Sequence, residues 1–93
     1  YQIGKYGRMR RSYLKEYRKI LYNNYVLEGT LFKHLAEIDQ ACNERMKNIV
    51  SAMAKQEGVT EALKAADQME WVRHINSIRN RAEEIILTEL VYA

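Results

Sequence analysis

Basic residues are concentrated near the start of this 93-residue chain. Residues 5–19 hold seven Lys or Arg against Glu16 alone, a net charge of +6, whereas residues 20–93 hold eight against eleven Asp or Glu, a net charge of −3. On a helix, six of the seven cations fall within an arc of about 140°. These six are Lys5, Arg8, Arg11, Lys15, Arg18 and Lys19. A nearly pure basic face is typical of a surface that binds nucleic-acid phosphates, so we expect it to contact DNA without reading its bases.

The opposite side of the same helix is apolar and rich in tyrosine. Met9, Tyr13, Leu14 and Tyr17 fall there, and Arg10 is the one cation inside this arc. We therefore expect these tyrosines in a core or an interface rather than as base-stacking platforms. Two other interpretations of the basic face are a solvated helix surface and a helix lying on a membrane. Tyr in place of Trp, Phe and Leu disfavours the membrane.

The other residues that could do chemistry form no complete catalytic or metal-binding motif. His34 and Glu37 lie three apart, and Glu70 and His74 lie four apart. Each pair could supply two ligands, but a metal centre in a helical bundle needs more. Cys42 follows the apolar spacing of its segment, which favours a buried thiol over a nucleophile. We predict no enzymatic activity, no metal and no cofactor.

A polar stripe near the end of the chain has two interpretations. It consists of Arg73, Asn76, Asn80 and Glu83, at steps of three and four. The simpler interpretation is surface pairing along one helix. The sharper one is a polar network that meets Asp39, Asn43 and Arg45 on a neighbouring helix and fixes register or partner choice.

Helices must position all of these side chains. The chain has no Pro, only four Gly and no long period-two alternation. Gly58 suits the left-handed position that ends a helix, with Val59 bonded back toward Ala54 and Thr60 capping the next helix. The junction of Gly29 and Thr30 repeats this pattern.

These boundaries predict an all-α, single-domain chain. We expect a flexible lead-in over 1–7, a basic helix over 8–28, a second helix over 31–57 and a third over 60–92. We expect the first helix to bend near 23–24, or to bury a locally wider surface there. Short corners between long helices predict a three-helix antiparallel bundle. Such a bundle is slender, so a second copy is expected to cover its apolar stripes as a dimer.

The sequence also bears on the compartment. Cys42 is the only cysteine, so no intrachain disulfide can form, which is typical of a reducing environment. No stretch approaches the ~20 apolar residues of a membrane-spanning helix. We expect a cytoplasmic protein with no membrane partner.

Three strings resemble the TnpV family of transposon-encoded proteins. They are IGKYGRMR at 3–10, HLAEIDQACNERM at 34–46 and EGVTEALKAADQMEWVRHINSIRNRAEEI at 57–85. The resemblance implies an accessory protein of a mobile element of Firmicutes that travels with a site-specific recombinase and is likened to excisionases. Family members usually have a further N-terminal stretch, so we expect the natural chain to begin before Tyr1. The long predicted helices do not suit a helix-turn-helix, and no hairpin signal predicts a wing.

Two functions are consistent with these features. The first is a non-catalytic accessory factor that binds DNA phosphates through its basic helix to assist or direct recombination. The alternative is a helical interaction module that contacts the recombinase or a host protein and does not bind DNA.

Overall fold

The chain forms an elongated all-helical molecule that is built on one long helical hairpin. A computed structural model describes residues 2–93 and has extents of 55 × 23 × 18 Å. Its elements are α1 (Lys5–Tyr17), α2 (Lys19–Glu28), α3 (Leu31–Gln56), α4 (Glu61–Ala66), α5 (Gln68–Ile86) and a terminal π-helical segment η1 (Leu87–Val91). Within residues 2–93 no strand is present, which confirms the all-α prediction. No helix in this range is long and apolar enough to cross a membrane.

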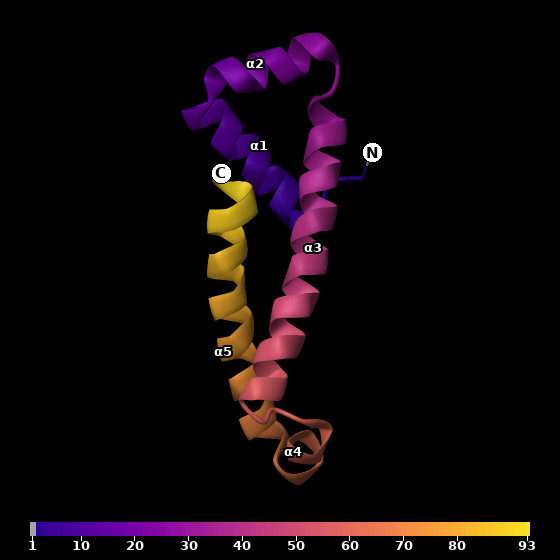
Figure 1. Cartoon of the computed structure of the whole chain (residues 1–93), viewed down its shortest axis with the longest axis vertical. Coiled ribbons are helices and arrows are strands. Elements are labelled where there is room, and N and C mark those ends of the chain that lie inside the picture. Colours follow the sequence, from indigo (N-terminus) through magenta and orange to yellow (C-terminus); the bar gives the residue numbers. More distant parts are fainter. Residues whose placement is uncertain (1) are drawn as a thin grey trace.

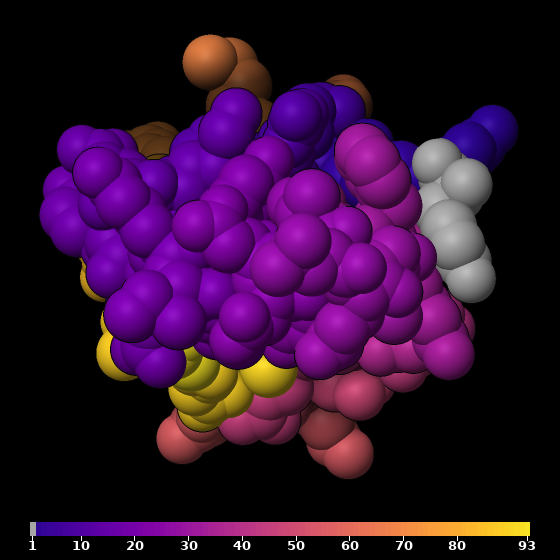
Figure 2. All heavy atoms as spheres, turned by 90° about the horizontal axis from the view of Figure 1, so that it is seen from above, coloured from indigo at the N-terminus to yellow at the C-terminus, as the bar shows by residue number. Residues whose placement is uncertain are grey.

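The arrangement differs from the expected three-helix antiparallel bundle. Figure 1 shows α3 and α5 side by side as the hairpin, with α1 crossing its open end obliquely and α2 lying across the top. Thus α1, α2 and the upper part of α3 form three sides of a triangle, and α1 does not run along the hairpin. Seen from above, α2 covers much of that end of the molecule (Figure 2).

The turn at the closed end of the hairpin matches the prediction. Gly58 has a φ of 72°, in the left-handed region, and the N–H of Val59 donates to the carbonyl of Ala54 at 2.8 Å. Of the two hydrogen bonds that define a Schellman motif, this is the one that spans more residues. The side chain of Val59 is buried. Thr60 caps α4, since its hydroxyl accepts from the Leu63 N–H at 3.3 Å.

The predicted third helix over 60–92 is not continuous. It stops at Ala66 and restarts at Gln68, because Asp67 leaves the helical conformation and its carboxylate accepts from the Glu70 N–H at 3.1 Å. A short acidic side chain that accepts a hydrogen bond from the backbone in this way favours the start of a new helix over the interior of one. At the other end, a wide π turn over Leu87–Val91 follows α5.

The predicted first helix is also two helices; its expected end at residue 28 is correct, but its expected start was wrong. It begins at Lys5, inside the expected lead-in, and breaks at Arg18, where φ is −135° and ψ is 56°. It does not bend at 23–24, which lie within α2. The break at Arg18 turns the chain so that Leu21, Tyr22 and Tyr25 pack beside Leu14. If the helix continued straight through residue 18, some of these three side chains would lie on the basic face instead.

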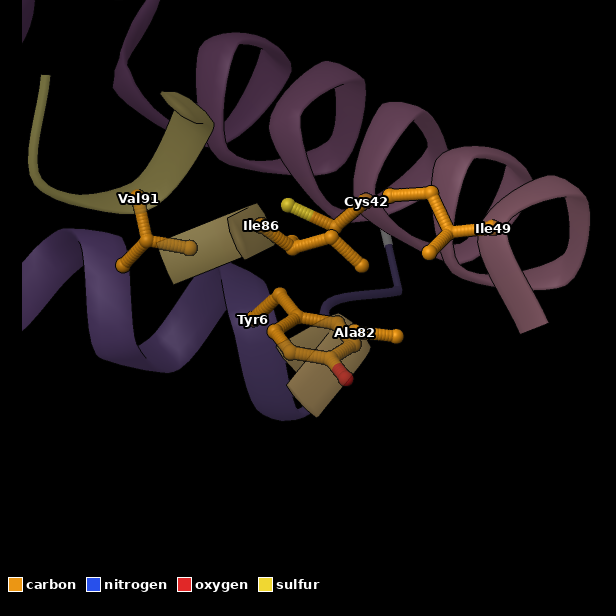
Figure 3. Close-up of a cluster of buried hydrophobic side chains, with 6 residues drawn as sticks. All are labelled: Tyr6, Cys42, Ile49, Ala82, Ile86 and Val91. Atoms are coloured by element: carbon orange, nitrogen blue, oxygen red, sulfur yellow. The ribbon is translucent and has the colours of Figure 1, made fainter. Parts of the chain in front are cut away.

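Two apolar clusters hold these helices together. The larger joins α1, α3, α5 and η1, and Figure 3 shows its buried members from those elements around Cys42 and Ile86. The smaller fills the triangle beneath α2 and is built on Leu14, Leu31 and Leu35. α1 contributes Tyr6 to the first cluster and Leu14 to the second. The orientation of α1 therefore depends on both clusters.

Candidate nucleic-acid interface

All six cations of the predicted basic face are exposed to solvent. They do not lie on one helix. Lys5, Arg8, Arg11 and Lys15 belong to α1, Arg18 occupies the break, and Lys19 begins α2. The face therefore runs along α1 and ends at the corner where α2 turns away (Figure 1).

The apolar arc of α1 fixes which way this face points. Leu14 is fully buried and Tyr6 is 6% exposed, while Met9 and Tyr13 are half-buried. Because this side packs onto the hairpin, the opposite side must face solvent. The structure thus confirms that the basic face of α1 points outward.

Arg10, the cation inside the apolar arc, is a structural residue. Its side chain is 6% exposed, and its Nη1 donates to the backbone oxygens of Val91 at 3.0 Å and Ala93 at 2.7 Å. Its Nε donates to Nε2 of His34 at 3.3 Å. Burial is the main reason why the pKa of Arg10 is lowered. This one guanidinium joins α1 to α3 and to the end of the chain, and so fixes the rotation of α1 about its axis.

The first turn of α1 is held by a carboxylate from another helix. Gly4 has no side chain to cap the helix, but Oδ1 of Asp39 on α3 accepts from the Gly7 N–H at 3.1 Å. A negative charge at this end also suits the helix dipole. A Cβ on Gly7 would lie 2.3 Å from a methyl of Ile3 and 3.1 Å from the Leu35 carbonyl oxygen. Glycine therefore permits the close crossing of α1 and α3, and this role was missed when the segment was interpreted as flexible.

Aromatic rings lie close to three cations of the face, Lys5, Arg11 and Lys15. The guanidinium of Arg11 lies 5.9 Å from the ring centre of Phe32, and Nζ of Lys15 lies 5.8 Å from that of Tyr22. Arg8 donates from Nη1 to the Ile3 carbonyl at 3.1 Å. These contacts orient the side chains without neutralising their charge.

Lys5 differs from the rest of the face because it is paired. Its Nζ lies 2.9 Å from Oε1 of Glu83 on α5, and this bond raises the pKa of Lys5. Tyr6 donates to the other Glu83 oxygen at 3.4 Å, a long bond. Glu83 therefore reaches α1, whereas the prediction directed the polar stripe toward the second helix.

The rest of that stripe behaves as an ordinary helix surface. Arg73 forms an ion pair with Glu70 one turn earlier, and Asn76 and Asn80 are exposed. The structure does not bring these three residues together with α3. Arg45, an expected partner on α3, instead pairs with Glu89 of η1. Of the two interpretations of the stripe, surface pairing describes Arg73, Asn76 and Asn80, and these residues form no network with α3 because this side of α5 faces solvent.

Three tyrosines form an exposed cluster beside the basic face. The ring of Tyr13 lies 5.6 Å from that of Tyr17 and 5.4 Å from that of Tyr92. Tyr17 is 67% exposed and Tyr92 is 46% exposed, so of the two places expected for the α1 tyrosines, a core or an interface, Tyr17 does not lie in the core. The three tyrosines line one surface groove together with Lys5 and Arg8.

The candidate metal and nucleophile residues have structural contacts. His34 stacks on Tyr25 with ring centres 4.4 Å apart, and burial, followed by the charge of Arg10, lowers its pKa. Cys42 is fully buried, as predicted, and burial raises the pKa of its thiol to about 11. Within residues 2–93, no group of three or more His, Cys, Asp or Glu side chains is placed to hold a metal ion.

Comparison with known families identifies the chain. A family model described as transposon-encoded protein TnpV matches residues 1–91. The chain belongs to the TnpV family. The match confirms the resemblance found in the sequence and gives the protein a transposon-associated role. No curated protein and no solved structure shows significant similarity to it.

The basic face of this TnpV protein has a spacing that suits a polyanion. From Arg8 to Lys15 the helix rises about 10 Å, at 1.5 Å per residue. Arg18 extends the row at the break. Within residues 2–93, the ion pairs that involve arginines outside α1 join Arg45, Arg73 and Arg81 to glutamates. In the same part of the chain, the exposed cations Arg8, Arg11, Lys15, Arg18 and Lys19 form no such pair, so their charge is available to an external anion.

Proposed function

We propose that this TnpV protein is a non-catalytic accessory factor that binds DNA phosphates through the basic face of α1. In this role it would assist or direct the recombination of its transposon, in the cytoplasm, where that DNA lies. The observation that carries the proposal is the row Arg8, Arg11, Lys15 and Arg18, which is exposed and has no acidic partner within residues 2–93. Lys5 contributes less because Glu83 already pairs with it.

The salt dependence of binding tests this proposal quantitatively. Each phosphate contact adds about −0.9 to the slope of log K against log salt, so four contacts give a slope of about −3.6. Raising the salt fourfold then weakens binding about 150-fold. Fluorescence anisotropy on a labelled duplex of the element's end measures this slope, and a scrambled duplex measures specificity. We expect similar affinity for both, since phosphate contacts carry no sequence information.

A charge-matched pair of variants distinguishes the contribution of the basic face to DNA binding from the contribution of the net charge. The first variant replaces the four cations of the row with Gln: Arg8→Gln, Arg11→Gln, Lys15→Gln and Arg18→Gln. The control removes the same charge from exposed positions on α3, α4 and α5: Lys47→Gln, Lys55→Gln, Lys64→Gln and Arg79→Gln. The proposal expects loss of binding in the first and near-normal binding in the control. Equal affinity of the two variants would contradict it.

The alternative function is a protein-interaction module that contacts the recombinase or a host protein. Absence of duplex binding even at low salt would favour this alternative. The exposed apolar side chains of α2 also support this alternative, because a partner protein could cover them: Ile20 is 80% exposed and Leu27 is 84% exposed.

A further inference from the structure

α2 is the helix whose sequence is least explained by the packing of a single chain. It contains no buried residue, although α1, α3 and α5 each bury several. Only its inner side, with Leu21, Tyr22 and Tyr25, touches the smaller apolar cluster. Its outer side carries Ile20 and Leu27, two of the most exposed large apolar residues of the described chain. Isolated exposed apolar residues are common, but here they belong to a pattern.

The sequence of α2 is chemically symmetric about its centre. It is KILYNNYVLE, so residues i and 47 − i correspond, as like with like inside the helix and as opposite charges at its ends. The matching pairs are Lys19 with Glu28, Ile20 with Leu27, Leu21 with Val26, Tyr22 with Tyr25 and Asn23 with Asn24. The end pair has opposite charges, and every other pair joins like with like. A segment of this kind is complementary to a second copy of itself turned end for end.

The residues needed for such a contact share the outer face. At 100° per residue, Asn23, Leu27, Ile20 and Asn24 fall in that order within an arc of about 100°. All four are exposed. The face has no charged residue between its ends, so it offers nothing to a phosphate backbone. Asn side chains at its centre can donate and accept hydrogen bonds to each other across a two-fold axis.

We propose that α2 is the contact between two copies of this chain, packed antiparallel about a two-fold axis between residues 23 and 24. Ile20 of each copy then packs on Leu27 of the other, and Lys19 of each lies beside Glu28 of the other. Charge complementarity selects a second copy as the occupant, because the antiparallel register forms both ion pairs and a parallel one forms neither. The top view in Figure 2 looks onto this end of the molecule, where α2 lies outermost.

The contact is short, which sets its strength. A helix of ten residues is about 15 Å long, so the buried area falls at the low end for specific interfaces. We therefore expect a dissociation constant in the micromolar range, and a mixture of monomer and dimer at laboratory concentrations.

The dimer would place two basic faces on either side of one axis. This consequence rests on the proposed function, whereas the dimer itself does not. Two-fold related basic surfaces can contact the phosphates of one duplex symmetrically about an axis perpendicular to it. Failure of DNA binding would leave the dimer in place, and failure of the dimer would leave phosphate binding by one α1 in place.

Sedimentation equilibrium of the full chain between about 1 µM and 1 mM tests the proposal. The wild-type chain should show reversible dimerisation. Replacing both apolar residues, Ile20→Asp with Leu27→Asp, should leave it monomeric throughout. The control is Met69→Asp with Val72→Asp, which adds two carboxylates at exposed apolar positions of α5, and it should dimerise as the wild type does. Circular dichroism confirms that each variant is folded.

A charge exchange tests the antiparallel register. Lys19→Glu places two like-charged pairs in the dimer and should weaken it about tenfold. Adding Glu28→Lys restores opposite charges and should restore dimerisation. A wild-type chain that stays monomeric at the highest concentration would overturn the proposal. So would a dimer that survives the Ile20 and Leu27 substitutions, or one that the charge exchange fails to restore.

Discussion

Arg10 offers the sharpest test of how α1 is held. We expect Arg10→Met to destabilise the fold, because Met retains much of the apolar stem and removes every donor. The side chain is 6% exposed, and its three acceptors are the backbone oxygens of Val91 and Ala93 and Nε2 of His34. The variant would leave the buried Val91 carbonyl without this donor.

The magnitude follows from opposing terms. A hydrogen bond that involves a charged group contributes about 1.5–3 kcal/mol, and Arg10 makes three. Desolvation of the guanidinium, which lowers its pKa, offsets part of this, and the 3.3 Å bond to His34 is the longest. We expect a net loss of about 2–3 kcal/mol in the free energy of unfolding. For a chain of this size that corresponds to a fall in Tm of roughly 10–20 °C.

The neighbouring residue provides the matched control. Arg11→Met removes the same charge from the same helix, but Arg11 is exposed and contacts the ring of Phe32. Surface changes of this kind usually stay within about 0.5 kcal/mol. Thermal and urea unfolding followed by circular dichroism measures both variants. If Arg10→Met were no less stable than Arg11→Met, the conclusion that Arg10 fixes α1 would be refuted.

Two further predictions concern His34 and Cys42. Because burial and Arg10 lower the pKa of His34, the unfolded chain takes up a proton first as the pH falls through the ordinary value of 6.5. Stability should therefore decrease below about pH 6.5. His34→Gln should flatten this decrease in urea titrations, and an unchanged pH profile would contradict the assignment. The thiol of Cys42, fully buried with a pKa of about 11, should react with iodoacetamide far more slowly in the native chain than in guanidinium. Equal rates would show that the larger cluster is open.

The sequence was most informative where one residue type decides the local conformation. Gly58, Val59 and Thr60 predicted the turn of the hairpin, and the bond from Val59 to Ala54 is as expected. Apolar spacing over 31–57 gave a helix that ends one residue earlier, at Gln56. The basic face was found because most of its cations, from Lys5 to Lys15, follow the period of one helix, α1.

Features that depend on tertiary contacts were missed. The cap of α1 comes from Asp39, 32 residues away from Gly7, and no local pattern announces it. The break at Arg18 has no Gly or Pro to predict it, and the residues that follow it, Leu21, Tyr22 and Tyr25, pack on the smaller cluster. Arg10 in the apolar arc was the one available signal for a buried cation. The ring of Tyr92 lies beside Tyr13 because the hairpin brings the end of η1 next to α1.

The separation of the two apolar clusters has a consequence for amide hydrogen exchange. α3 and α5 bury residues along their shared interface, so their central amides should exchange only through global unfolding. α2 buries none, and its amides should exchange through a local opening that leaves the hairpin intact. The two ends of the molecule would thus act as separate cooperative units, with α1 shared between them. α2 can then open and close without exposing Cys42 or Ile86 of the larger cluster to solvent.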